Sequence, residues 1–379
     1  MKKAIFKNRN GLPDLTLLIT VILLSLYGTV MVFSAGGPYA EARYGDAYHF
    51  IKRQIIWLAV GLVVMLLSSR MDIDAVRRLS PWAYLITLLL LILTLAIGFV
   101  GNGAQRWISL GPITIQPSEI AKLSMIMMLA YYFSKKEGLA CFGKERKKSF
   151  IWGTLIPCGI MLLPIVLVML QHHLSCIIIL GCIGLLLIIC AGIDLRYIAI
   201  FTGLGALGVS YIAFFTDYTK DRITAWRNPE AYKLTGGWQT LQGLMAIGSG
   251  GLFGKGLGQG ELKHCYVSEP ANDMIFAILC EELGLLGAIL ALLLFGVLIY
   301  RGYKISVSQS DTYSRLLGLG ITIKMSIQAL LNVAVVTNTI PNTGISLPFF
   351  SYGGSSLIML FFEMGLLLSL SRGRGRSKL

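Results

Sequence analysis

The sequence predicts an all-α protein that crosses a membrane about ten times. Of its 379 residues, 55% are hydrophobic and only 14% are charged, and the mean hydropathy is +0.72. Apolar runs of about 20 residues recur along nearly the whole chain, and a bilayer requires such runs whereas a soluble core does not. We therefore expect a single integral-membrane domain over residues 1–379, with one long extracytoplasmic loop at about 217–271.

Ten apolar runs define the predicted spans in chain order. The first resembles a signal peptide, but its apolar region is too long for one and further spans follow, so we interpret it as a retained helix. The spans lie roughly at 14–35, 54–70, 80–100, 118–134, 151–170, 174–192, 196–216, 272–300, 315–337 and 345–370. An even number of crossings returns the C-terminus to the side of the N-terminus.

Lysine and arginine are distributed unequally over the connecting segments. If the N-terminus is cytoplasmic, 21 of the 33 basic residues fall in inner segments and ten in outer segments. Because cytoplasmic loops carry the excess of Lys and Arg, this distribution predicts a multi-pass protein with both termini in the cytoplasm. Topology thus explains the net charge of +14, and the high charge does not indicate a nucleic-acid partner.

The outer segment at 217–271 is too rich in apolar residues to be a disordered tether. It contains Trp226, Trp238 and several aliphatic side chains, so we expect it to be ordered against the outer mouth of the bundle. Residues 240–247 predict a short interfacial helix. The glycines between 248 and 260 do not form a nucleotide-binding loop, because the terminal Lys-Ser/Thr pair is missing. They predict a bent segment with tight turns or close approach of backbone to substrate.

Asp273 leads directly from this outer segment into the eighth predicted span. A carboxylate at the mouth of a membrane helix is costly to desolvate, which makes it a functional-site candidate. An acid at a helix start also complements the helix dipole, and on residue type alone the two interpretations are equally good. Deeper in the span, Glu281 could face the same cavity and Glu282 points to the opposite side. Structural roles are the favoured interpretation for both.

A second informative stretch is GNGAQRWISLGPITIQPSEIAK at 101–122. Arg106 and Trp107 lie in a short outward loop, and Pro117 suits the first turn of the fourth span. Glu119 and Lys122 are three residues apart, which predicts an ion pair on one helical face just below the outer surface. A buried ion pair is costly, so either ligand contact or the fixing of helix position explains it.

Two further cations join this group on the outer side. Arg53 stands at the outer start of the second span, and Lys263 lies in the long outer segment. Several cations near one carboxylate suit an anionic lipid bearing a diphosphate, whose reaction needs a base.

The cysteine and histidine pattern does not predict a metal site. The seven cysteines show no CxxC spacing. The adjacent His172 and His173 have no further ligands nearby in sequence, which is a weak signal. Cys265 is the one cysteine expected to be exposed on the outer side.

Four stretches resemble the shape, elongation, division and sporulation (SEDS) family of bacterial peptidoglycan polymerases. The most specific is NVAVVTNTIPNTGISLPFFSYGGSSLI at 332–358. The others are RWISLGPITIQPSEIAK at 106–122, YTKDRITAWRNPE at 218–230 and GWQTLQGLMAIGSGGLFGKGLGQG at 237–260. The resemblance covers essentially the whole chain, including the ten-span layout.

The resemblance implies glycosyl transfer with lipid II on the outer face of the bacterial cytoplasmic membrane, with inversion and release of undecaprenyl diphosphate. The family's essential aspartate falls on Asp273, which would be the general base. Residues that would line the substrate cavity are Arg53, Arg106, Trp107, Glu119, Lys122 and Lys263, and Glu269 belongs to the same substrate-binding set. A divalent cation, Mg²⁺ or Mn²⁺, on the diphosphate is a further expectation, with its ligands unassigned; no organic cofactor is expected. A class B penicillin-binding protein is the implied partner.

The chain departs from the family's usual wording at several positions. QHHLSC at 171–176 stands where QPDLGT is usual, and Ser268 and Asn272 replace proline and threonine. Asp273, Glu269 and Lys263 are in place, so the expected chemistry is unaffected.

Two other functions compete with polymerisation. Acids and lysines within the spans are also what a lipid II flippase would need along its path. A scaffold for a penicillin-binding protein would need mainly small and apolar residues, which the polar outer face does not favour.

Overall fold

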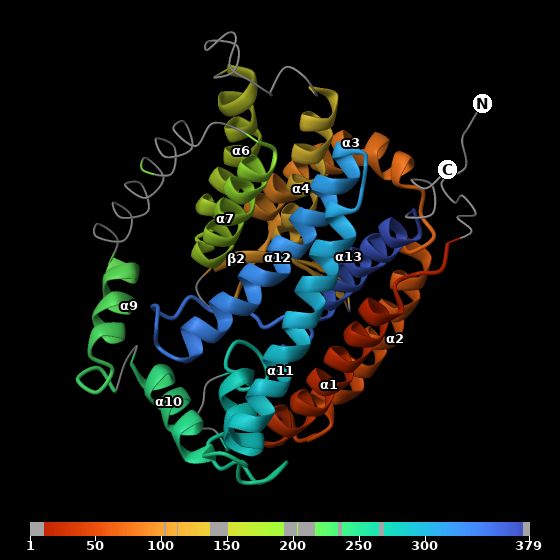
Figure 1. Ribbon diagram of the computed structural model, residues 1–379. Helices are drawn as coiled ribbons and strands as arrows, with labels where there is room; N and C mark the ends of the chain where they lie inside the picture. Colours follow the sequence, from red (N-terminus) through yellow and green to blue (C-terminus); the bar gives the residue numbers. More distant parts are fainter. Residues whose placement is uncertain are drawn as a thin grey trace.

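The chain forms a bundle of long helices with one small sheet (Figure 1). The computed structural model describes residues 11–101, 104–111, 113–136, 151–192, 203, 217–233, 237–264 and 269–373. The predicted span at 196–216, apart from residue 203, and Cys265 lie outside the described residues. Every other predicted span falls on a helix, and the prediction of a polytopic all-α membrane protein is confirmed.

Some consecutive helices are joined by short turns and others by long connecting segments. They are α1 (Leu15–Tyr44), α2 (His49–Ser68), α3 (Ile73–Ile97), α4 (Pro117–Lys135), the π-helical turn η1 (Ile151–Leu155), α6 (Ile156–Leu170), α7 (Leu174–Cys190), α9 (Asp217–Arg227), α10 (Trp238–Gly250), α11 (Ile275–Val307), α12 (Thr312–Val336) and α13 (Gly354–Arg372).

Local sequence signals fix several helix starts. The Asp14 side chain accepts a hydrogen bond from the Leu17 backbone N–H at 3.0 Å, and Asp311 does the same for Ser314 at 3.0 Å. These are N-caps, which satisfy backbone donors that have no partner within the helix. Pro117 occupies the first turn of α4, where its missing N–H is harmless.

Seven described helices are long and apolar enough to cross a membrane: α1, α2, α3, η1 with α6, α11, α12 and α13. The shorter α7 is also apolar, and α4 coincides with the predicted fourth span but is less apolar. Among these, α13 is the central helix. Two-thirds of its span is buried inside the protein, and it contacts α1, α2, α3, α4, α11 and α12.

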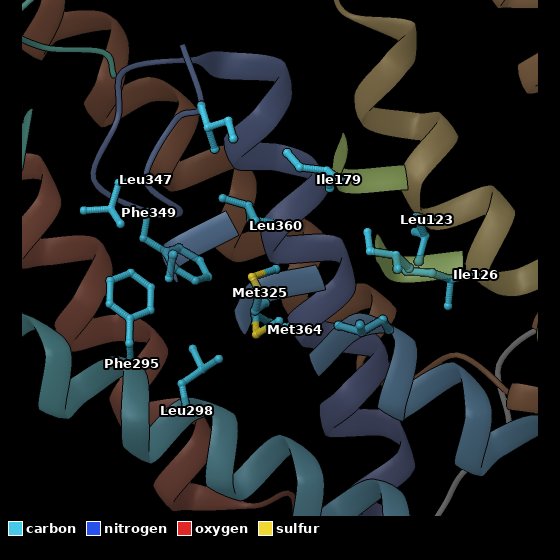
Figure 2. Packing of buried hydrophobic residues seen from close by; sticks show 14 of the residues in the cluster. Leu123, Ile126, Ile179, Phe295, Leu298, Met325, Leu347, Phe349, Leu360 and Met364 are labelled. Atoms are coloured by element: carbon cyan, nitrogen blue, oxygen red, sulfur yellow. The ribbon is translucent and has the colours of Figure 1, made fainter. Parts of the chain in front are cut away.

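The apolar core lies where α11, α12 and α13 meet. Figure 2 shows Met325 of α12 beside Met364 of α13, with Phe295 of α11 facing Phe349. All four side chains are at most 3% exposed. Dense packing of this kind holds the helix ends in fixed relative positions, and the site is built on those ends.

The predicted start of the last span at 345 is wrong, because residues 340–353 form an ordered non-helical segment. The Gly344 backbone N–H donates to Asn342 Oδ1 at 3.0 Å, and both Gly344 and Phe349 have positive φ. A helix cannot contain these conformations, so α13 begins only at Gly354.

The predicted outward loop around Arg106 is a three-stranded antiparallel sheet. Strands β1 (Phe99–Gly101), β2 (Ala104–Leu110) and β3 (Ile113–Ile115) are hydrogen-bonded in that order. Gly111 supplies the positive φ that the turn after β2 requires. β-Branched residues near this glycine favour strands over an irregular loop.

Candidate functional site

A cavity of about 820 Å³ opens where the segments predicted to face outward come together. Its wall is formed by α2, the β2–β3 hairpin, the start of α4, residues 172–179, α9, α10, residues 269–273 and residues 342–357. These segments are far apart in sequence. The structure thus gathers Arg53, Arg106, Trp107, Glu119, Lys122, Glu269 and Asp273 around one space.

Asp273 is half-buried in this wall, in the turn that precedes α11. The Gln239 side-chain amide of α10 donates to both carboxylate oxygens, each at 3.4 Å. Gly344, in the non-helical segment before α13, lies at ordinary contact distance, since a Cβ on it would be 3.6 Å from Asp273 Oδ2. The carboxylate is therefore directed into the cavity by neighbours from two other elements.

Burial raises the pKa of Asp273 from its ordinary value of 3.8 to about 6. The negative charge of Glu269 adds to this effect, whereas the Gln239 hydrogen bond and the Arg222 charge oppose it. A carboxylate in this range is ionised at neutral pH and still basic enough to accept a proton. The helix-dipole interpretation of Asp273 does not account for its position inside a cation-lined cavity.

The turn that carries Asp273 is held by the segment at 340–353 and by α12. The Asn332 amide donates to the Asp273 carbonyl at 2.8 Å and to the Ile345 carbonyl at 2.7 Å. Ser351 Oγ donates to the Asn272 carbonyl at 2.7 Å and accepts from the Leu347 N–H at 2.8 Å. The most specific sequence motif thus positions the acid through backbone contacts.

Cations enter the cavity from separate elements. Arg53 comes from α2, Arg106 from β2, Lys122 from α4 and Arg222 from α9. Arg106 is held by donation to the His172 carbonyl at 3.0 Å, and Arg222 by donation to the Asn342 carbonyl at 2.9 Å. Guanidinium groups fixed in this way are suited to bind phosphate oxygens.

The predicted Glu119–Lys122 ion pair is confirmed, with Lys122 Nζ 2.7 Å from Glu119 Oε1. Both side chains are at least nine-tenths buried and line the cavity. A second buried pair lies nearby, where Lys324 Nζ of α12 is 2.5 Å from Glu363 Oε1 of α13. The first pair lies within α4, and the second links α12 to α13.

The prediction that Lys263 lines the same cavity is wrong. Lys263 is 3% exposed and its Nζ lies 2.6 Å from Glu282 Oε1, 3.2 Å from Ser34 Oγ and 2.8 Å from the Gly258 carbonyl oxygen. Sequence showed only that Lys263 belongs to the outer segment. It did not show that a buried acid about two turns inside α11 would pair with it.

Glu281 also does not reach the cavity, contrary to the prediction that it could. Its Oε1 accepts from Lys255 Nζ at 3.0 Å and from the Glu261 backbone N–H at 2.9 Å. The structural interpretation of Glu281 and Glu282 therefore holds. The helical angle argument failed because Asp273 precedes the helix, so the regular helical rotation does not relate it to Glu281.

The glycines after α10 bring backbone against backbone, not against a ligand. Gly254 has φ +79°, and a Cβ on it would lie 2.2 Å from the Glu282 carbonyl oxygen. This close approach allows two backbone hydrogen bonds. The Gly256 N–H donates to the Glu282 carbonyl at 2.9 Å, and the Leu285 N–H donates to the Gly251 carbonyl at 2.9 Å. Gly284 interrupts the helical backbone of α11 at this contact.

Sequence reasoning did not single out Gln239, Asn342, Asn332 or Arg222 as site residues. They form one chain of hydrogen bonds around the acid, in which Asn342 Nδ2 donates to Gln239 Oε1 at 3.0 Å. Each lies in a stretch that carried the family resemblance. Their motifs could have suggested them, but only the fold shows that they surround Asp273.

The described residues contain no cluster of three or more His, Cys, Asp or Glu side chains that could hold a metal ion. Asp273 and Glu269 are the acids that line the cavity besides the ion-paired Glu119. Among the described residues, one or two carboxylates are thus available there, and a bound cation would take its other ligands from elsewhere.

Comparison with known proteins gives matches over nearly the full length. The family model described as "Cell cycle protein" (FtsW/RodA/SpoVE) matches residues 14–375. The chain is 38% identical to stage V sporulation protein E of Bacillus subtilis, over 95% of this chain and 97% of that protein. It is 37% identical to the probable peptidoglycan glycosyltransferase FtsW of Trichlorobacter lovleyi, over 95% of this chain and 93% of the relative.

A solved structure has the same fold. It is described as showing "structural coordination of polymerization and crosslinking by a peptidoglycan synthase complex". One chain of it superimposes with a TM-score of 0.78 at 25% identity, covering 96% of this chain and 99% of that chain.

Proposed function

Because this chain belongs to the FtsW/RodA/SpoVE family of cell cycle proteins, we propose that it polymerises lipid II into glycan strands with Asp273 as the general base. It is a peptidoglycan glycosyltransferase, the activity for which its curated relatives are named. The observation that carries the proposal is the position of Asp273, half-buried in a cavity whose walls also present Arg53, Arg106, Lys122 and Arg222.

The reaction needs one proton acceptor and a stabilised leaving group. Asp273 takes the proton from the 4-hydroxyl of one disaccharide as that oxygen bonds to the anomeric carbon of the next. The bond from that carbon to the diphosphate oxygen breaks, and undecaprenyl diphosphate leaves with the electron pair. A single displacement inverts the anomeric centre, so a second carboxylate acting as nucleophile is not required.

The cations of the cavity are suited to the leaving group. Arg53, Arg106 and Arg222 come from three separate elements, which allows them to surround a diphosphate rather than touch one side of it. Charge developing on the departing oxygens is stabilised most strongly where water is excluded and the donors are already fixed. The bonds that hold Arg106 and Arg222 to backbone carbonyls supply that fixation.

A divalent cation, Mg²⁺ or Mn²⁺, is part of the proposal. Mg²⁺ is commonly bound by one or two carboxylates together with substrate phosphates. Among the described acids, Glu269 is the best placed to bind the cation together with Asp273. Its negative charge is close enough to raise the pKa of Asp273, and its Oε2 accepts a hydrogen bond from Asn272 Nδ2 at 2.5 Å. When bound, the cation would neutralise the diphosphate.

Orientation and partner complete the proposal. We assign the cavity to the outer face of the cytoplasmic membrane, with both termini inside, because inner segments carry most of the basic residues. A class B penicillin-binding protein is the proposed partner. Support comes from the matched fold, which occurs in a complex that combines polymerization with crosslinking.

The test is polymerisation of labelled lipid II by the purified chain with its partner. Asp273→Ala should lower the rate by about 10²- to 10⁴-fold, the range expected for loss of a general base. Asp46→Asn is the matched control, because Asp46 is an outer acid that does not line the cavity and should leave the rate unchanged. Rapid polymerisation by a well-folded Asp273→Ala protein would remove Asp273 from the mechanism.

The same variant separates polymerisation from lipid transport. In liposomes that contain labelled lipid II, a flippase would expose the label on the opposite leaflet whether or not Asp273 is present. Strand synthesis that depends on Asp273, without an accompanying change in label exposure, supports the polymerase.

A further inference from the structure

The cavity has two polar regions with different charged neighbours. The charged groups that act on the pKa of Asp273, besides the larger effect of burial, are Glu269 and Arg222. The charged groups that act on the pKa of His173, which precedes α7, are Arg106, Lys122 and Glu119. The second region therefore lies around the buried Glu119–Lys122 pair. Its cations Arg106 and Lys122 belong to the proposed diphosphate site, whereas His173 and Gln328 have no part in the chemistry proposed so far.

Three buried polar atoms in this second region have no hydrogen-bond partner among the described residues. They are His173 Nδ1, Glu119 Oε2 and Gln328 Oε1. All three residues line the cavity and are at least nine-tenths buried. Gln328 lies one turn from Lys324 on the same face of α12. The positive charge of Lys324 is close enough to interact with the Glu119 carboxylate.

Buried polar atoms without partners are rare in folded proteins, because each loses its bonds to water and gains nothing in return. Three residues with such atoms line the same cavity, which indicates a place where a ligand supplies the missing bonds. A carboxylate oxygen and an amide oxygen are acceptors, and a neutral imidazole has one nitrogen that accepts. Their natural complement is a group with several O–H and N–H donors.

Burial and the positive charges of Arg106 and Lys122 lower the pKa of His173 to about 3. The imidazole is therefore neutral at any pH at which the membrane protein works. A neutral ring can accept a hydrogen bond without adding a third positive charge to this region.

We infer that His173, Glu119 and Gln328 form a second subsite that binds the hydroxyl- and amide-bearing sugar of the substrate, apart from the base at Asp273. This inference rests on the proposed function, because it takes lipid II as the ligand. It assigns His173 a direct contact with substrate. A sugar carrying hydroxyls and an acetamido N–H can satisfy all three acceptors, and the Lys122 ammonium faces its oxygens.

The experiment measures equilibrium binding of fluorescent lipid II to the purified full-length chain carrying Asp273→Asn, so that turnover does not interfere. Adding His173→Leu removes the acceptor and keeps an apolar side chain of similar size. Loss of one hydrogen bond to the ligand should weaken binding about five- to tenfold. His173→Asn keeps an acceptor near the Nδ1 position and should restore binding to within about twofold.

His264→Leu is the matched control, since His264 is an exposed histidine outside the cavity and its loss should not alter affinity. Thermal melting checks that each variant is folded. If His173→Leu fails to fold, Gln328→Met carries the test, with the same expected weakening.

The possible outcomes are distinct. Binding of lipid II to the parent but equal binding to folded His173→Leu or Gln328→Met would overturn the subsite alone. Absence of lipid II binding to the parent would overturn the proposed function together with the subsite. Weaker binding that His173→Asn restores supports the direct contact.

Discussion

At the scale of single residues, the surroundings of Asp273 determine the pH at which it can act. An aspartate with its ordinary pKa of 3.8 would be a weak base, whereas burial raises the pKa here to about 6. The base must be ionised to accept a proton. Activity should therefore rise as pH increases through about 6 and level off above about 7, until another group titrates.

Gln239 also affects the pKa of Asp273, and the direction of its effect can be tested. Its hydrogen bonds to the carboxylate favour the ionised form and lower the pKa of Asp273. Gln239→Leu should therefore raise that pKa further and move the acid limb of the rate profile to higher pH. The measurement is the initial rate of lipid II polymerisation between pH 5 and 8.

Gln242→Leu is the control for this experiment. Gln242 is a buried glutamine on the same helix, does not line the cavity, and its Oε1 has no partner among the described residues. Its loss should leave the midpoint unchanged. An identical midpoint in Gln239→Leu and in the unaltered protein would contradict the assignment of the limb to Asp273.

Lys263 leads to a prediction about stability, since it pairs with Glu282 away from the cavity. Lys263→Met leaves a buried carboxylate without its cation, which costs about 3–5 kcal/mol. The double variant Lys263→Met/Glu282→Gln should recover much of the loss. The folded fraction of each variant should bind lipid II with an unchanged KM. The readouts are thermal melting in detergent and KM.

Lys255→Met provides the comparison, because Glu281 keeps bonds from the backbone N–H groups of Glu261 and Leu262 when Lys255 is removed. Its melting temperature should fall less. A large rise in KM for Lys263→Met at unchanged stability would show instead that Lys263 binds substrate.

At the scale of elements, the contact between the outer segment and α11 depends on glycine. A Cβ on Gly250 would lie 1.9 Å from the Cys280 carbonyl oxygen, and this neighbour is backbone that cannot rotate away. Gly250→Ala should therefore force α10 away from α11 and lower the melting temperature by several degrees. Thermal melting of the purified protein measures it.

Gly248→Ala is the matched substitution, two residues earlier on α10 with open space around the new methyl group. Alanine there should be neutral or stabilise the helix by up to about 1 kcal/mol. Equal melting temperatures for the two alanine variants would show that the close approach of α10 to α11 does not matter.

The sequence predicted the long helices well and the segments between them poorly. Apolar runs of membrane length located the helices because the bilayer imposes that length. The same criterion extended the last span back to 345, since residues 345–350 are largely apolar. Their side chains are buried, but their backbone is held by Asn332 and Ser351, which hydropathy cannot register.

The candidate site shows the same division. Asp273, Arg106 and the Glu119–Lys122 pair were predicted because charged residues near membrane helices are rare and costly. Lys263 and Glu281 were misplaced because their partners lie 19 to 26 residues away, across a loop whose path depends on backbone contacts. Gln239 and Asn342 are neutral, so charge did not single them out, and only the fold shows that they surround Asp273.

At the scale of the whole molecule, the ends of helices at the face away from the cavity are also tied together. Arg301 of α11 pairs with Asp14 before α1, and the Asp14 N–H donates to Ser371 Oγ of α13 at 3.0 Å. Arg77 of α3 lies 3.5 Å from Asp311 before α12. The bundle is thus clamped at its two faces by different polar groups.

The proposed orientation predicts which face a membrane-impermeant thiol reagent reaches. In a cysteine-free parent, His264→Cys should be labelled in intact cells because it is exposed in the segment between α10 and α11, which is proposed to lie outside. Ser308→Cys, exposed between α11 and α12, should be labelled only after the membrane is permeabilised. Labelling of Ser308→Cys in intact cells would reverse the assignment of inside and outside.

The support of Asp273 by residues 342–352 has a consequence for biosynthesis. The acid is translated some 70 residues before the segment that fixes its backbone, so a partly synthesised chain contains the carboxylate without its final setting. Ribosomes that stall before this segment would release a polypeptide with most of its helices and no competent centre. Glycan synthesis by a single chain would therefore begin only after residues 342–352 have been made and have packed against the turn that carries Asp273.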